Sequence, residues 1–325
     1  CEACHGPGRE HVEANRDPLR RYGLHQAGKG DPTIVNPARL DKERSAETCG
    51  QCHAVSVPPY PNAADRYRQT GKPYRPGPDL DDSMLVIHPG RGETAWFEEL
   101  FPKFFSDRFW ADGMVRVAGR EYHGLLNTPC HQRGEMTCLT CHAMHKESND
   151  ARSDLDWAND QLKEGFRGNA ACTQCHEDLA TSAGLEAHTH HPVGTSGSNC
   201  MNCHMPHTTY GLLKGIRSHQ IDSPSVAVTL ETGRPNACNL CHLDQTLDWT
   251  ATHLEKWHDH PSPSLDADQK KIAASLLWLL TGDAGQRALV ASAMGRPEPQ
   301  EVSGADWMPP FLAQTNFDPY HAVQI

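Results

Sequence analysis

The chain has 325 residues, of which 37% are hydrophobic and 7% aromatic, with 26 glycines and 24 prolines. This is a poor supply of side chains for the conventional core of a protein of this length. The formal charge of −11 argues against a surface that binds nucleic acid or anionic lipid. The sequence also contains no run of about 18 apolar residues, so it predicts no membrane-spanning helix.

One five-residue pattern, Cys-x-x-Cys-His, starts at the first residue and occurs six times, using twelve of the 13 cysteines. We number the copies motif 1 (residues 1–5), motif 2 (49–53), motif 3 (138–142), motif 4 (172–176), motif 5 (200–204) and motif 6 (238–242). One helical turn would place both sulfurs on one side, where they can form thioethers to the two vinyl groups of a porphyrin, and the histidine then faces the iron. This is the attachment pattern of haem c, and six copies predict six covalent haems.

The predicted cofactor-binding and proximal residues follow directly from the motifs. The thioether residues are Cys1, Cys4, Cys49, Cys52, Cys138, Cys141, Cys172, Cys175, Cys200, Cys203, Cys238 and Cys241. The proximal iron ligands are His5, His53, His142, His176, His204 and His242. The haems themselves should replace much of the missing apolar core.

The 21 histidines exceed the six that the motifs use, and ligation of the second face of each iron would explain the surplus. A histidine within a few residues of a motif cannot cross to the far face of its own porphyrin, so it should serve a neighbouring haem. The predicted distal ligands are His11, His145, His188, His191, His207 and His219. Surface or propionate-bonding roles are the alternative for each, and Met144, Met201 and Met205 are alternative ligands.

Two further interpretations of the cysteines stay open. Paired Cys-x-x-Cys segments can bind zinc, but three four-cysteine sites would leave the histidine after every pair unexplained. The odd cysteine, Cys130, is expected to be a buried inert thiol. It precedes His131, and the pair could instead hold a singly attached seventh haem.

Between motifs 2 and 3 the sequence predicts Pro/Gly-rich loops and an aromatic run at residues 96–110 that packs on a porphyrin or in a small core. Motifs 3 to 6 then follow within 138–242, too close for independent domains, so their haems should be neighbours. After motif 6, apolar spacing predicts helices at 247–257, 268–280 and 284–294, with a Pro/Ser linker at 261–264. Further helices are expected at 307–314 and from about Pro319.

We therefore expect a mainly α fold with long loops and little or no β-structure. A hexahaem domain (1–261) would be packed around its haems and followed by short helices of the HEAT-repeat type (262–325). The sequence begins without a signal peptide, and its helical repeats end at Ile325 without an obvious capping repeat. We therefore expect it to be incomplete at both ends.

Several motif contexts resemble those of multihaem cytochromes related to hydroxylamine oxidoreductase and the octahaem cytochromes. They are Cys4-His5-Gly6-Pro7-Gly8 with His11, Cys141-His142 with His145, Cys203-His204-Met205-Pro206, Pro235-Asn236-Ala237-Cys238, the histidines at 188, 190 and 191, and Arg217-Ser218-His219. The resemblance covers residues 1 to about 245 and is strongest to bacterial periplasmic members with helical repeats. It implies a haem-packed electron carrier. Catalytic relatives keep a special haem with lysine in place of the motif histidine or with a porphyrin-bonded tyrosine, whereas all six motifs here end in histidine.

The predicted function is electron transfer through mostly bis-histidine haems, to or from other cytochromes or redox complexes, in the periplasm or outside the cell. The chain could also polymerise into a haem wire or join a larger assembly. The alternative is a reductase or oxidase of small nitrogen or sulfur compounds with one open haem, for which Tyr122, His123 and Arg133 are candidate proton-transfer residues. No catalytic residue is assigned, and an electron carrier is favoured over an enzyme.

Overall fold

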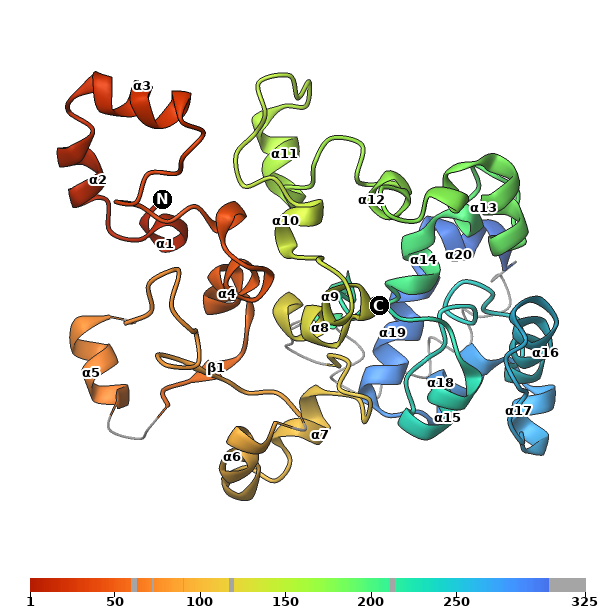
Figure 1. Ribbon diagram of the computed structural model, residues 1–325. Helices are drawn as coiled ribbons and strands as arrows, with labels where there is room; N and C mark the ends of the chain where they lie inside the picture. The colour runs from red at the N-terminus through yellow and green to blue at the C-terminus, as the bar shows by residue number, and fades with distance from the viewer. Residues whose placement is uncertain (60–62, 72, 90, 117–119, 211–213, 304–325) are drawn as a thin grey trace. The chain divides into compact units, whose positions relative to one another are not determined.

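The computed structural model describes residues 1–303 except 60–62, 72, 90, 117–119 and 211–213. It consists of short helices joined by long loops, as the sequence predicts (Figure 1). The chain forms two compact units, each built from two segments: unit 1 comprises Cys1–Leu100 and Arg120–Glu164, and unit 2 comprises Phe101–Gly119 and Gly165–Ile325. The predicted boundary at residue 261 divides the segment that carries the haem motifs from the helical segment that follows. It was not drawn between compact units, and it stays a prediction.

Unit 1 contains mostly helices of one to three turns. They are α1 (Glu2–His5), α2 (Arg9–Ala14), α3 (Pro18–Gln26), η1 (Pro37–Arg39), α4 (Lys42–His53), α5 (Ala63–Thr70), η2 (Gly92–Thr94), α6 (Ala95–Leu100), α8 (Glu121–Asn127), α9 (Pro129–Gln132), α10 (Cys138–Cys141) and α11 (Asp154–Asp160). Strands β1 (Ser56–Val57) and β2 (Leu85–Val86) pair antiparallel, with Ser56 opposite Val86.

A small core in unit 1 lies where α4 and α8 meet. It contains Ala46, Ala54, Tyr74, Leu80, Met84, Val86, Tyr122 and Leu125. A Cβ added at Gly50, inside motif 2, would lie 3.0 Å from the Tyr122 ring, so glycine allows this close packing. The core therefore fixes α8 directly against a haem motif.

Unit 2 contains the remaining helices and the second hairpin. Its elements are α7 (Phe104–Arg108), α12 (Ala170–Thr173), η3 (Glu177–Ala180), α13 (Ser182–Thr189), η4 (Ser196–Ser198), α14 (Cys200–His204), β3 (His207–Tyr210), β4 (Lys214–Arg217), α15 (Val226–Thr232), α16 (Leu247–His258), α17 (Ala267–Lys271), α18 (Ala274–Thr281), α19 (Ala284–Met294) and α20 (Pro297–Val302). Strands β3 and β4 pair antiparallel, with His207 opposite Arg217.

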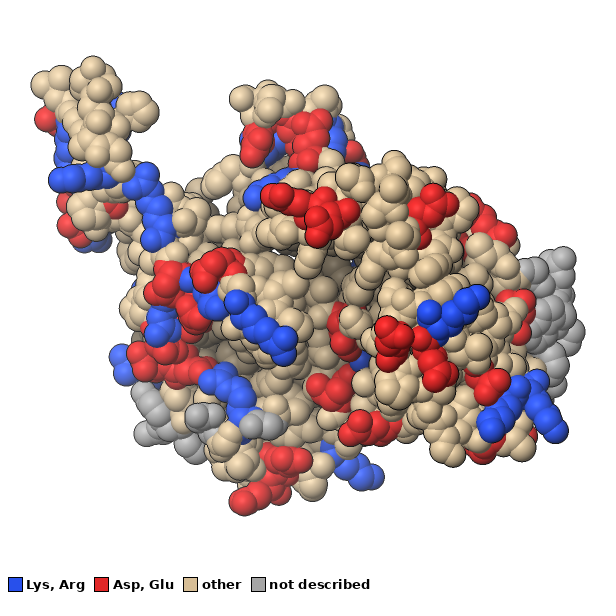
Figure 2. Space-filling view, turned by 45° about the vertical axis from the view of Figure 1, so that its right-hand side comes forward, with Lys and Arg blue, Asp and Glu red and all other residues tan. Residues whose placement is uncertain are grey.

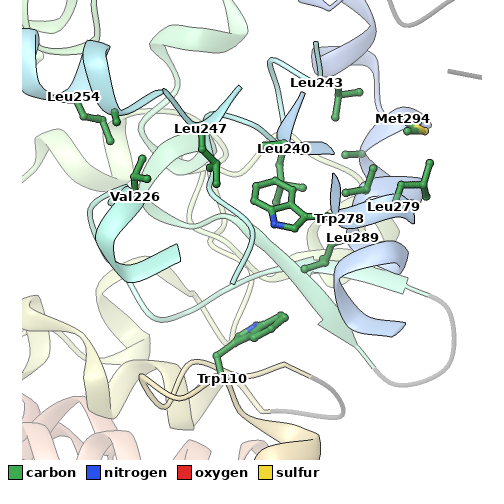
Figure 3. Close-up of a cluster of buried hydrophobic side chains, with 14 of the residues drawn as sticks. Trp110, Val226, Leu240, Leu243, Leu247, Leu254, Trp278, Leu279, Leu289 and Met294 are labelled. Atoms are coloured by element: carbon green, nitrogen blue, oxygen red, sulfur yellow. The ribbon is translucent and has the colours of Figure 1, made fainter. Parts of the chain in front are cut away.

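The core of unit 2 connects motif 6 with the helices that follow it. Leu240 and Leu243, in and after the motif, pack with Leu247 of α16, Trp278 of α18 and Leu289 of α19 (Figure 3). Within motif 6, Asn239 is fully buried, donates to the Gln245 and Thr246 carbonyls and accepts from the Thr250 hydroxyl. The last helices thus form one packed body with this motif.

The predicted helices at 247–257 and 284–294 are confirmed by α16 and α19. Helix α19 starts with a capping box between Asp283 and Gln286. The single helix predicted at 268–280 is wrong in one respect, because Ile272 is extended and separates α17 from α18. The break lets the Ala274 amide donate to the Gln245 carbonyl at 3.0 Å, a tertiary bond that periodicity does not reveal. The helices predicted at 307–314 and from Pro319 lie outside the described residues.

Candidate haem-binding sites

All six motifs form one helical turn, the geometry that thioether attachment requires. The histidine amide donates to the carbonyl of the first cysteine in motifs 1, 3, 4 and 6, at 2.9, 2.9, 3.0 and 2.7 Å. Motifs 2 and 5 lie at the ends of α4 and α14, inside regular helix. No disulfide links any of the thirteen cysteines, so both sulfurs of each motif remain available for attachment to a cofactor.

In unit 1, motifs 1, 2 and 3 are neighbours. The Gln51 side chain of motif 2 donates to the Ala3 carbonyl of motif 1 at 2.7 Å. The thiols of Cys49 and Cys138 are hydrogen-bonded, which lowers the pKa of Cys49 to about 7 and raises that of Cys138. The three attachment sites of this unit therefore follow one another in space, with motif 2 between motifs 1 and 3.

In unit 2, motifs 4, 5 and 6 are arranged in the same way. The side chain of Asn169, before motif 4, donates to the Ser198 carbonyl at 2.8 Å and accepts from the Cys200 amide at 3.0 Å. The Cys172 thiol hydrogen-bonds Cys200 and lowers the pKa of Cys200 to about 7. Burial, followed by the charge of Cys203, raises the pKa of Cys238 to about 12, which places motifs 5 and 6 close together.

Three motif histidines each lie opposite a second histidine ring, and the distance between ring centres is nearly the same in all three pairs. The ring centres are 6.1 Å apart for His5 and His145, 6.0 Å for His204 and His188, and 6.0 Å for His242 and His191. Metal–imidazole bonds are about 2 Å long, so two imidazoles on opposite faces of one iron have ring centres about 6 Å apart. The three pairs fit this spacing.

Distance alone does not define a haem site, as a fourth histidine pair shows. The rings of His88 and His123 are 5.9 Å apart, but neither residue belongs to a motif. The Nε2 atom of His123 is 3.0 Å from the Ile87 carbonyl, so it points at backbone rather than at an iron. The diagnostic feature is a second ring at this distance from a motif histidine.

Hydrogen bonds hold several candidate ligands in the orientation that iron binding needs. The Nδ1 atoms of His5, His142 and His204 lie 2.8, 3.0 and 2.8 Å from the backbone carbonyls of residues 35, 160 and 222. His191 is held likewise, with Nδ1 2.6 Å from the Thr189 carbonyl. Donation from Nδ1 leaves Nε2 with a lone pair for a metal.

The site between His191 and His242 is also a cavity. It is lined by both histidines, by Cys238 and Cys241 of motif 6, and by Trp249, Trp257 and Leu254 of α16. The Trp249 ring lies 5.0 Å from that of His242. Apolar walls, two sulfurs and two facing imidazoles form a donor set that fits a covalent haem.

The remaining predicted distal ligands are placed differently. His11 lies 3.1 Å from the Asp31 carboxylate through Nδ1, and His219 is half-buried just after β4. The Arg296 guanidinium lies 2.7 Å from Nδ1 of His207, and burial together with Arg296 and Arg217 lowers the pKa of His207 to about 3. Because a guanidinium only donates, the ring proton of His207 is on Nε2, which does not favour an axial role. The assignments of these three residues stay predictions.

Motif 2 differs from the other motifs in the partner of its histidine. The Nδ1 atom of His53 lies 2.8 Å from a carboxylate oxygen of Glu121, the first residue of α8. The hydrogen bond and charge of Glu121 raise the pKa of His53. Sequence reasoning missed this contact, because the two residues are 68 positions apart.

The residues considered for proton transfer in an enzyme do not form an open site. Tyr122 and His123 are buried, with 6% and 0% exposure, whereas Arg133 is exposed. Burial, followed by the charge of His88, lowers the pKa of His123 to about 4. Cys130 is half-buried rather than fully buried. Among the described residues, no group of three or more His, Cys, Asp or Glu side chains is arranged to hold a metal ion.

Sequence reasoning also missed two half-buried arginines beside motifs 5 and 6. Arg217 donates to the Met201 carbonyl at 2.9 Å and to the Asn202 side chain at 2.5 Å. Arg296 donates to the Leu240 carbonyl at 3.1 Å. Burial lowers the pKa of both arginines. The charge of Arg296 lowers the pKa of Arg217 further, whereas the charge of Glu298 partly offsets the effect of burial on Arg296. Such cations are suited to offset haem carboxylates, and only the burial, not the sequence, identifies them.

Comparison with known proteins agrees with this chemistry over part of the chain. Residues 158–243 match the family described as cytochrome c7 and related cytochrome c. That segment contains motifs 4, 5 and 6 and so carries a c-type haem-binding pattern found in known cytochromes. No curated protein matches the chain.

One solved structure aligns with the whole length of this chain. The crystal structure of the outer cell wall cytochrome OcwA has 17% sequence identity and a TM-score of 0.46, covering 100% of this chain and 68% of that protein. The described residues contain no helix long and apolar enough to span a membrane.

Proposed function

We propose that this protein transfers electrons through six covalently bound c-type haems, most of them ligated by histidine on both faces. The observation that carries the proposal is the set of three motif histidines that each face a second imidazole at 6.0 to 6.1 Å. A haem held in this way supplies reversible one-electron chemistry at low potential without an open coordination position.

Different residues would ligate the cofactors and orient their ligands. His145 would be the distal ligand at motif 1, His188 at motif 5 and His191 at motif 6, while His11 and His219 remain candidates for the other motifs. His207 is a candidate only after release of its hydrogen bond with Arg296. The Asp222 carbonyl orients His204, and the Arg234 guanidinium lies 2.7 Å from the Asp222 carboxylate and so fixes that loop. The adjacency of motifs 1 to 3, and separately of 4 to 6, supports transfer between neighbouring cofactors within each unit.

Location and partners follow from the chemistry of attachment and from the surface. Thioether formation to haem takes place outside the cytoplasmic membrane, which supports a periplasmic or extracellular protein. On the face drawn in Figure 2, Asp and Glu are interspersed with Lys and Arg. We infer that the partners are cytochromes, other redox complexes or further copies of this chain in a polymer, with residues 262–325 as a HEAT-like helical segment.

An EPR spectrum of the oxidised, haem-loaded protein tests this proposal. We expect low-spin ferric signals to dominate, because two imidazoles give a strong axial ligand field. Addition of nitrite or cyanide should leave the signals of the paired haems unchanged. A dominant high-spin signal that shifts with these small ligands would instead support the alternative, an enzyme acting on small nitrogen or sulfur compounds.

A further inference from the structure

The histidine of motif 2 has a hydrogen-bond partner of a different kind from those of its neighbours in unit 1. His5 and His142 present Nδ1 to neutral backbone carbonyls at 2.8 and 3.0 Å. His53 presents Nδ1 to the Glu121 carboxylate at 2.8 Å. The charge of the Asp160 carboxylate also acts on His142, but of these three histidines His53 is the one hydrogen-bonded directly to a carboxylate.

The position of Glu121 is fixed by the fold rather than by a mobile surface chain. It directly precedes Tyr122, whose buried ring packs against Gly50 inside motif 2. Its own side chain is 27% exposed, compared with 58% for His53. The packing of α8 on α4 thus brings the carboxylate to the motif and holds it there.

A carboxylate behind a metal-bound imidazole changes the electronics of the metal. By attracting the Nδ1 proton it makes the ring a stronger donor through Nε2, which favours the ferric over the ferrous state. A neutral carbonyl does this less. In the one-electron couple, Fe(III) gains one electron to become Fe(II), and the proton stays in the hydrogen bond between Nδ1 and the carboxylate.

We propose that Glu121 is a positioning residue that makes the haem of motif 2 the lowest in reduction potential of the three in unit 1. The proposal rests on the proposed function, since it needs a haem at His53. A low-potential site between two higher ones would hold electrons only briefly and pass them to either neighbour. Glu121 therefore sets the order in which the haems of this unit fill.

The test is a redox titration of the complete haem-loaded chain carrying Glu121→Gln, with dithionite as reductant and ferricyanide as oxidant. Glutamine keeps the size and an oxygen acceptor but removes the charge. We expect one midpoint potential, at the low end, to rise while the others stay in place, and one set of low-spin EPR g-values to change. Glu121→Asp, which keeps the charge but shortens the side chain, should give a smaller shift in the same direction.

Two controls make the result specific. Glu98→Gln removes an exposed carboxylate of α6 in the same unit and should move no potential. In a chain with Cys49 and Cys52 replaced by serine, the effect of Glu121→Gln should disappear. The proposal is overturned if Glu121→Gln moves no transition, moves all of them equally, or acts no differently from Glu98→Gln. The mass of the peptide containing Cys49 separates this failure from the absence of a haem at motif 2.

Discussion

Replacing Gly197 by alanine should convert the haem of motif 6 from low-spin to high-spin. A Cβ at this position would lie 2.1 Å from Cδ2 and 2.4 Å from Cγ of His191, well inside van der Waals contact. The ring cannot simply move aside, because its Nδ1 is held at 2.6 Å by the Thr189 carbonyl. The clash can therefore be relieved only by breaking this hydrogen bond, and the imidazole would then lose its alignment with His242.

The change is measured by EPR and by cyanide binding. The variant should show a new high-spin ferric signal from one of the six haems, and that haem should bind cyanide. Gly168→Ala is the matched control, since the nearest atom to its Cβ would be 4.0 Å away and the variant should keep the wild-type spectrum. If the Gly197→Ala protein folds and stays fully low-spin, His191 is not an axial ligand.

Replacing His145 by alanine should open the haem of motif 1, although His145 follows motif 3 in the sequence. The rings of His145 and His5 are 6.1 Å apart, and both residues lie in unit 1. Loss of the distal imidazole leaves a five-coordinate or water-ligated iron, so a high-spin signal and a rise in reduction potential are expected. His25→Ala, at an exposed histidine of the same unit, should change neither property.

A double variant assigns the affected haem. In a chain whose Cys1 and Cys4 are replaced by serine, motif 1 carries no haem, and His145→Ala should then produce no new high-spin signal. A signal that persists in this background would mean that His145 serves another haem, and the pairing with His5 would be wrong.

The sequence was sufficient to predict features that depend on local spacing. The helical turn of each motif follows from five consecutive residues, and α19 follows from its apolar period. The sequence also predicts that His145, as an iron ligand, would serve a haem other than that of its own motif. Its pairing with His5 could not be predicted, because the two rings come together only through the packing of unit 1.

The features that sequence reasoning missed all depend on long-range contacts. Glu121 looks like an ordinary first residue of a helix until α8 packs on α4 and brings it to His53. Gly197 reads as a loop glycine, although its lack of a side chain makes room for the His191 ring. The split between α17 and α18 likewise follows from a hydrogen bond to Gln245, 29 residues before Ala274.

The most direct test of the whole account is the intact mass of the purified protein, together with its colour. We predict a red protein whose denatured mass exceeds that of the polypeptide by six haem groups, with one haem on each peptide that contains a motif. A colourless protein, or one whose mass equals that of the bare chain, would contradict the account.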